Sequence, residues 1–276
     1  MVAVFWEFTM QSRVVGTVLL AAILAGCSAG EPNNSAALPE LVEVAGPARE
    51  VMQAGEYLLD GRLIASDTVM YAPAPSLKVM KYQVSQYDYD QCVRAERCKA
   101  ADAVGRGQAK DRPVVGVSWQ DGQDYAAWLS ERTGKQFRLP DYLEWSYFAD
   151  QKVPESAQGG LDENEQAALW LQEYQDSYKR KQEQEVPLAP LGQGTANAYG
   201  VFDAGGQVAE WTNTCHVRVH RISMPRAESR LENCGVRTLG GEHIAVMPDF
   251  IRDPKTGACS VGVPPRYLGL RLVTED

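Results

Sequence analysis

Two carboxylate residues, Asp203 and Glu210, stand seven positions apart around the pair Gly205-Gly206. Hard cations bind several oxygen ligands, and a glycine-rich loop allows backbone carbonyls to turn inward beside carboxylates. The spacing therefore favours a site for a hard cation in this loop. The alternative is an acidic turn whose carboxylates hydrogen-bond to the backbone of the loop itself, and the sequence leaves both interpretations open.

Five cysteines could form disulfides or supply thiolates: Cys92, Cys98, Cys215, Cys234 and Cys259. Cys92 and Cys98 enclose five residues at the end of a predicted helix, and Cys215 and Cys234 enclose a charged stretch that we interpret as a loop. Both pairs favour local disulfides, although a sequence alone does not fix the connectivity. Local pairing leaves Cys259 without a partner. Such a cysteine in an exported protein is either a small buried residue or a reactive thiol.

Three histidines lie in the same C-terminal third as Cys259: His216, His220 and His243. An imidazole beside a thiol lowers the pKa of that thiol, so His243 and Cys259 are the candidate catalytic pair. Imidazole also suits copper or iron. His216 and His220, however, lie on a segment that alternates like a strand, where residues four apart are farther from each other than on a helix. We interpret these two as ordinary surface or loop histidines.

Three capping motifs predict the helices that support these residues: Ser85–Asp88, Ser118–Asp121 and Asp141–Glu144. Each motif places a capping oxygen three residues before a carboxylate. The capping oxygen accepts hydrogen bonds from the free N–H groups of the first turn, and the carboxylate interacts favourably with the helix dipole. Gly134 predicts the end of the second helix, and a short strand is expected over Lys135–Leu139.

The interval of about 151–196 predicts a helical insertion, because apolar residues recur at helical spacing from 161 to 185. The pair Val186-Pro187 ends this pattern. Past Trp211 the sequence predicts mostly irregular chain. The last segment, Tyr267–Val273, alternates in hydrophobicity and predicts a final buried strand.

Residues 1–26 predict a bacterial lipoprotein signal peptide. Arg13 precedes an apolar run, Val14–Ala25, that is too short to span a bilayer. The ending Leu24-Ala25-Gly26-Cys27 resembles the lipoprotein box, in which the cysteine becomes the lipidated first residue of the mature protein. An ordinary signal peptide with an incidental cysteine is the alternative. Ser28 follows the box instead of an aspartate, which points to an outer-membrane lipoprotein facing the periplasm.

The net charge of −9 restricts the partners of this chain. An acidic domain repels nucleic acid and anionic headgroups, so we expect no nucleic-acid partner and membrane attachment only through the N-terminal lipid. Residues 27–48 are small, polar and interrupted by proline, which predicts a lipidated, flexible tether. Residues 49–276 suffice for one sizeable core and predict a single domain that contains the insertion.

Two blocks carry a resemblance to a known family. The first extends from Pro113-Val-Val-Gly-Val-Ser-Trp to Arg138-Leu-Pro-Asp-Tyr-Leu-Glu-Trp145, and the second is Asn197-Ala-Tyr-Gly-Val-Phe-Asp-Ala-Gly-Gly-Gln-Val-Ala-Glu-Trp211. In this order they resemble the formylglycine-generating enzyme family, also called the sulfatase-modifying factor family. The closing Tyr267-Leu-Gly-Leu-Arg-Leu-Val273 is similar to the family's final Gly-Phe-Arg strand. The resemblance covers about Val79–Val273. It implies an α+β, C-type-lectin-like fold with a twisted antiparallel sheet, two main helices and much irregular loop.

The resemblance also implies metal sites. Family members bind structural calcium at the positions that match Asp203, Gly206, Val208 and Glu210, and secreted members contain local disulfides similar to those expected here. Family oxidases hold copper(I) between two thiolates and oxidise a substrate cysteine with oxygen. In this chain Cys259 lies near that place without a second thiol, and Leu239-Gly-Gly-Glu-His243 replaces the family's Arg-Gly-Gly-Ser.

Two functions follow from this comparison. The first is a lipid-anchored accessory or maturation factor that binds an exported protein client or an envelope complex, without the two-cysteine oxidase chemistry. The alternative is a formylglycine-generating oxidoreductase that modifies a client cysteine through Cys259 and copper.

Overall fold

The computed structural model describes residues 38–102, 106–151, 188–241, 244–252 and 267–276, together with the helical positions Ala168, Leu171 and Gln175. The chain divides into the units Met1–Asn34 and Ser35–Asp276, and all described residues belong to the second unit. The predicted signal peptide, with Cys27, lies outside the described residues. So do most of the predicted insertion and the candidate pair His243 and Cys259.

The three capping motifs each begin a helix, as the sequence predicts: α1 (Gln86–Arg94), α2 (Trp119–Thr133) and α3 (Tyr142–Phe148). The cap of α2 is reciprocal, because the Ser118 Oγ accepts from the Asp121 backbone N–H while the Asp121 Oδ2 accepts from the Ser118 N–H at 2.7 Å. Gly134 ends this helix with a φ of 70°, a conformation that glycine adopts without a Cβ clash.

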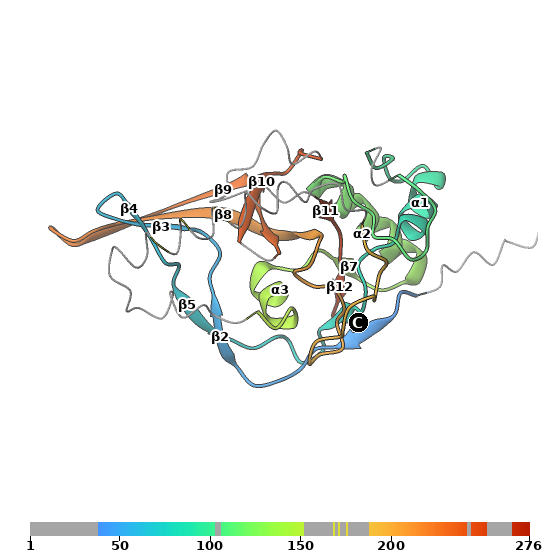
Figure 1. Cartoon of the computed structure of the whole chain (residues 1–276), viewed down its shortest axis with the longest axis horizontal. Helices are drawn as coiled ribbons and strands as arrows, with labels where there is room; N and C mark the ends of the chain where they lie inside the picture. Colours follow the sequence, from blue (N-terminus) through green and yellow to red (C-terminus); the bar gives the residue numbers. More distant parts are fainter. Residues whose placement is uncertain are drawn as a thin grey trace, which may run out of the picture. The chain divides into compact units, whose positions relative to one another are not determined.

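The described strands form three sheets (Figure 1). A six-stranded sheet contains β10 (Ala245–Pro248), β9 (Ala227–Gly240), β8 (Ala209–Ile222), β3 (Glu56–Leu59) and β4 (Arg62–Ile64) in this order, with β11 (Leu268–Gly269) also paired to β8. A four-stranded sheet has the order β1 (Leu41–Glu43), β6 (Lys78–Met80), β12 (Val273–Thr274) and β7 (Phe137–Arg138). The third sheet pairs β2 (Arg49–Met52) with β5 (Thr68–Tyr71).

The predicted fold class is confirmed, and the pairing is chiefly antiparallel as expected. Two contacts, β3 with β8 and β11 with β8, are parallel. The sheet is therefore mixed at its centre, where β8 receives parallel neighbours on one side and antiparallel β9 on the other.

One sequence interpretation is wrong. The stretch between Cys215 and Cys234 is not a loop, and the chain past Trp211 is not mostly irregular, because β8 and β9 form a long antiparallel hairpin (Figure 1). Val217 and Val219 are buried on one face of β8, whereas Arg218 and His220 on the other face are exposed and polar. This agrees with the strand-like alternation seen in the sequence for this segment, whereas β9 is exposed over most of its length and carries no such alternation.

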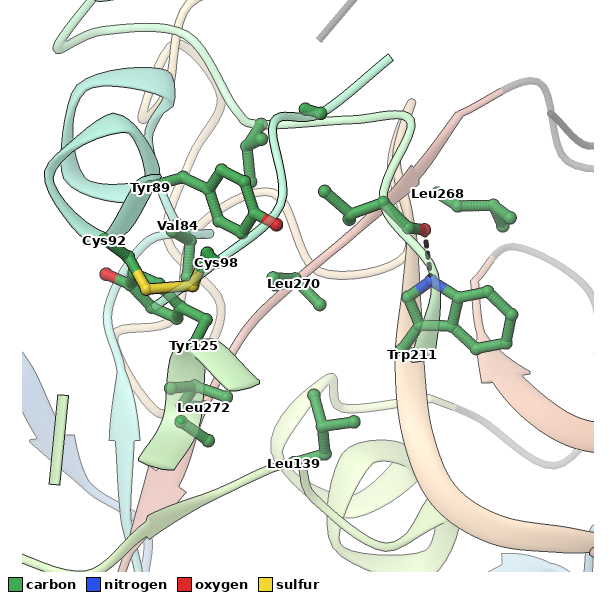
Figure 2. Close-up of a cluster of buried hydrophobic side chains, with 14 of the residues drawn as sticks. Val84, Tyr89, Cys92, Cys98, Tyr125, Leu139, Trp211, Leu268, Leu270 and Leu272 are labelled. Carbon is green, nitrogen blue, oxygen red and sulfur yellow. Dashed lines mark hydrogen bonds between the residues drawn. A yellow bond between two sulfur atoms is a disulfide. The ribbon is translucent and has the colours of Figure 1, made fainter. Parts of the chain in front are cut away.

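The closing segment is buried, as predicted, and it supplies the centre of the main core. Figure 2 shows Leu270 and Leu272 of this segment near Tyr89 of α1 and Tyr125 of α2, and Leu268 near Trp211 of β8. All three leucines are fully buried, and burial of one such side chain contributes about 1.5–3 kcal/mol. The Trp211 Nε1 donates to the Val117 carbonyl at 2.8 Å, which satisfies the one polar group of this indole.

Gly269 belongs to the same segment and permits a close approach of three chain segments. A Cβ at this position would lie 2.8 Å from the Val114 carbonyl oxygen and 2.5 Å from a methyl group of Val208. Only glycine fits between these groups without displacement of the backbone.

Among the described residues, no helix is long and apolar enough to cross a membrane.

Candidate functional site

Glu210, the second carboxylate of the glycine-rich loop, forms an ion pair with Arg271 in the protein interior. The Arg271 Nε donates to the Glu210 Oε2 and the Arg271 Nη2 donates to the Oε1, each at 2.9 Å. Both side chains are fully buried. A buried charge pair is stable only when its geometry is good and its remaining polar atoms have partners. The two parallel hydrogen bonds meet the first condition.

The remaining polar atoms of the pair also have partners. The Gln83 Nε2 donates to the Glu210 Oε1 at 2.8 Å, and the Trp145 Nε1 donates to the Oε2 at 2.9 Å. The Arg271 guanidinium makes its other donations to backbone carbonyls, those of Met80, Lys81 and Phe202. Each oxygen of Glu210 therefore accepts two hydrogen bonds. The network joins α3, β8 and the closing segment, and this makes it a structural anchor of the domain.

Asp203, the first carboxylate of the loop, has a different environment and is partly exposed. Its Oδ2 accepts from the Gly192 backbone N–H at 2.6 Å, and its own carbonyl oxygen accepts from the Gly206 N–H at 3.2 Å. The φ of Asp203 is 59°, in the left-handed region that aspartate tolerates better than most residues. Asp203 thus closes a turn that hydrogen-bonds to backbone groups.

Both expected disulfides, Cys92–Cys98 and Cys215–Cys234, are formed. The second lies between β8 and β9, and the Glu232 carboxylate is next to it. Cys215, Glu232 and Cys234 are residue types that can bind metals, and their ligand atoms lie within 4.8 Å of one another. They form the one such cluster found in the ranges that the structure describes. The disulfide bond engages both sulfur atoms. Glu232 was not singled out from the sequence, because its proximity to Cys215 depends on the register of the hairpin.

One face of the six-stranded sheet carries a groove of about 830 Å³. Leu58 and Leu63 stand opposite each other on β3 and β4, and Arg218 and Leu231 stand opposite each other on β8 and β9. All four line the groove. The Arg218 Nη2 lies 2.6 Å from the Glu56 Oε2, so an ion pair crosses the floor between apolar walls.

His216 also lines this groove, next to the disulfide in sequence. Its Nε2 lies 3.9 Å from the Glu56 Oε2, and its Nδ1 is buried without a hydrogen-bond partner among the described residues. Burial lowers the pKa of the imidazole below its ordinary value of 6.5, although the Glu56 charge acts in the opposite direction. His220 is exposed farther along β8 and stands opposite Ser229. In the described region neither histidine belongs to a cluster of three or more metal-ligating residue types.

A family model described as "Sulfatase-modifying factor enzyme 1-like domain" matches residues 30–276. The chain belongs to this family. The family assignment from the two sequence blocks is thereby confirmed, and the Glu210–Arg271 anchor joins the second block to the closing strand that carried the same resemblance.

Relatives of known sequence support the assignment. The formylglycine-generating enzyme of Mycobacterium tuberculosis is 31% identical over 178 residues, which cover 59% of this chain and 57% of that protein. The mouse formylglycine-generating enzyme is 30% identical over 133 residues, 42% of this chain and 32% of that protein. The chain thus spans only part of these relatives. The solved structure of PvdO from Pseudomonas aeruginosa aligns with a TM-score of 0.50 at 20% identity, covering 86% of this chain and 95% of that one, and shows the shared fold.

The calcium site that the family implies was expected at Asp203, Gly206, Val208 and Glu210. In the described arrangement the Glu210 oxygens already accept four hydrogen bonds, so they offer no free lone pair to a cation. Asp203 is engaged with the Gly192 N–H. Asp203 bonds to backbone groups, as the second sequence interpretation expects, whereas all four hydrogen bonds to the Glu210 carboxylate come from side chains. The residues present therefore do not fit a calcium ion as arranged, and no role is assigned to one.

The copper site of the family oxidases needs two thiolates. The two disulfides engage four of the six cysteines, and the remaining two are Cys27 and Cys259. Within residues 49–276, Cys259 is therefore the one cysteine outside the two disulfides. Whether His243 adjoins Cys259 stays a prediction, since both lie outside the described residues.

Proposed function

We propose that this sulfatase-modifying-factor-like protein is an accessory or maturation factor that binds an exported protein client, without two-thiolate oxidase chemistry. The use of four cysteines in disulfides supports the second half of this proposal, because it leaves Cys259 without a partner thiol in the domain. Disulfides also agree with an oxidising compartment. The sequence ending in Cys27 supports anchoring by a lipid to the outer membrane, on its periplasmic side.

The observation that carries the client-binding role is the groove on the six-stranded sheet. Its volume of about 830 Å³ and its mixture of apolar walls with a few polar groups are typical of binding sites. Leu231 on its wall is 67% exposed, and Ile222 and Met224 near the tip of the same hairpin are also exposed. Apolar side chains gathered on a projecting hairpin indicate a surface for another protein.

The sheet also offers a backbone edge to such a client. β4 is the last strand of the sheet on the β3 side, and its described pairing is with β3 alone. An extended client segment could add to this edge through main-chain hydrogen bonds and place apolar side chains against Leu63 and Leu58. The Glu56–Arg218 ion pair in the floor would favour a segment with polar residues at its centre.

A site-specific crosslinking experiment tests this role. The photoreactive amino acid benzoylphenylalanine is placed at Leu231 in the full lipidated chain, and at Met70 as a control with a similar exposure of 65% outside this groove. We expect Leu231 to crosslink one discrete envelope protein in intact cells and Met70 not to do so. Crosslinking from both positions alike, or from neither, would contradict the groove as the client site.

Metal analysis of the same protein distinguishes the oxidoreductase alternative. After copper loading, stoichiometric copper in the wild type that disappears in Cys259→Ser would favour an oxidase over a binding factor. Equal and negligible copper in both proteins is the outcome that the proposal expects.

A further inference from the structure

The two disulfides of this domain differ sharply in their environments. Cys92 and Cys98 are 0% and 8% exposed and lie in the main core (Figure 2). Cys234, in contrast, is exposed on β9, and its partner Cys215 is only half-buried on β8. Cys234 is therefore the cysteine of the two disulfides that lies at the surface of the folded domain.

Charged groups distinguish the two sulfur atoms of the exposed disulfide. The Arg237 Nη1 donates to the Cys215 Sγ at 3.3 Å. The Glu232 Oε1 lies 3.5 Å from the Cys234 Sγ. A guanidinium stabilises a thiolate on the sulfur that it contacts, and a carboxylate opposes one. Negative charge released by cleavage of this disulfide is therefore favoured on Cys215.

Arg237 is held in place for this contact. Its guanidinium stacks over the Trp119 ring, 3.9 Å from the centroid, and its Nη1 also donates to the Asn213 carbonyl at 3.0 Å. The Arg237 Nε is buried without a hydrogen-bond partner in the described part of the chain. Burial lowers the pKa of this guanidinium, with the carboxylates of Asp249 and Glu232 opposing that effect, yet arginine keeps its charge in proteins. A thiolate on Cys215 would give this incompletely satisfied cation an anionic partner.

From this geometry we propose that Cys215–Cys234 is a thiol–disulfide exchange site for an exposed thiol, separate from the client groove and independent of the role assigned to it. The incoming thiolate attacks the Cys234 Sγ and forms a mixed disulfide. The Cys215–Cys234 bond breaks, and its electron pair leaves on Cys215 as a thiolate next to Arg237. A second thiolate then attacks the sulfur of the first bound thiol. This releases the oxidised thiol pair as a disulfide and leaves Cys234 reduced, so two electrons have passed to the domain.

Differential alkylation with peptide mass spectrometry tests this proposal on the full chain. The folded protein is equilibrated in mixtures of reduced and oxidised glutathione, and each cysteine is scored separately. We expect Cys215–Cys234 to open while Cys92–Cys98 stays oxidised and the circular dichroism spectrum stays native. Opening of Cys92–Cys98 first, or of both pairs only when the protein unfolds, would overturn the assignment.

Charge variants test the mechanism of exchange. Arg237→Gln should slow the reaction with glutathione about tenfold, because the leaving thiolate loses its stabilising cation. Arg237→Lys should recover most of the rate. Arg230→Gln, which removes an exposed charge from the same strand pair at a position opposite Val219, should leave it unchanged. Where Arg237→Gln fails to fold, Glu232→Gln serves in its place and should accelerate the attack at Cys234. Rates that do not respond to either substitution would refute the role of these charges.

Discussion

The Glu210 carboxylate and the Arg271 guanidinium meet in the protein interior although 61 positions separate them in the chain. The pair connects the glycine-rich loop to the closing segment, and its other hydrogen bonds reach α3 through Trp145 and the β6 strand through Met80. Four elements distant in sequence thus depend on one buried contact. This arrangement explains why the most recognisable loop of the chain serves structure in this protein.

Removal of one partner of this pair should destabilise the domain strongly. Glu210→Gln leaves the Arg271 charge buried without its counterion, a change that costs about 3–5 kcal/mol. We expect a large drop in the midpoint of chemical denaturation. The exposed pair Arg97–Glu131 supplies the control, because Glu131→Gln removes a pair of the same chemistry at the surface and should leave the midpoint nearly unchanged. Equal effects of the two substitutions would contradict an anchoring role.

The saturation of Glu210 leads to a prediction about calcium. A cation that stabilised the folded state would raise the melting temperature with its concentration. Because the Glu210 oxygens are already used by Gln83, Trp145 and Arg271, we expect the same melting temperature in millimolar calcium and in excess chelator. Differential scanning calorimetry at constant ionic strength measures this directly. A chelator-dependent decrease of several degrees would show that the loop rearranges around a bound ion.

Gly269 provides a test of the packing at the parallel contact between β11 and β8. Gly269→Ala places a methyl group against the Val114 carbonyl and the Val208 side chain, and overpacking of this kind costs about 1–3 kcal/mol. Gly235→Ala on the exposed hairpin is the matched control, since its nearest contact, the Asn233 Oδ1, would lie at an ordinary 3.4 Å. Urea denaturation compares the two variants. A stability of Gly269→Ala equal to that of the control would mean that this part of the core is less tightly packed than described.

Local signals explain which parts of the fold could be predicted from the sequence. The helix starts at Ser85, Ser118 and Asp141 were correct because a cap and its carboxylate lie within one turn of each other. The short strand after Gly134 and the buried closing segment were also predicted correctly. The signals for them, a glycine that ends a helix and a run of alternating hydrophobicity, each lie within a few neighbouring residues.

Contacts between distant segments explain what was missed. The segment from Cys215 to His220 alternates like a strand, but β9 is exposed and charged over most of its length and lacks the apolar alternation by which a strand is recognised, so the β8–β9 hairpin was not expected. Arg237 lies beside Cys215 because of an irregular register near this residue, and Glu232 lies beside Cys234 two positions away on the same strand. The partnership of Glu210 with Arg271 likewise depends on the tertiary fold, so the sequence did not indicate this ion pair.

The last prediction concerns the pH dependence of the groove. Burial of His216 lowers its pKa in the folded state below 6.5, the ordinary value that applies to the unfolded chain. At a pH between the folded-state and unfolded-state pKa values, the unfolded chain therefore binds more protons than the folded one. The stabilising contribution of the neutral imidazole is therefore complete above pH 6.5 and is lost as the pH falls through the folded-state pKa. We expect the free energy of unfolding to decrease between pH 7 and pH 5, and this decrease to be smaller in His216→Gln.

His220→Gln is the control for this experiment, because His220 is exposed on the same strand and its substitution should retain the wild-type pH profile. Urea denaturation at each pH gives the free energy of unfolding, and proton NMR of the imidazole ring gives the pKa of His216 itself. A pKa above 6.5 would mean that the Glu56 carboxylate, 3.9 Å away, outweighs the effect of burial. The groove would then gain a positive charge, and with it a preference for acidic clients, as the pH falls.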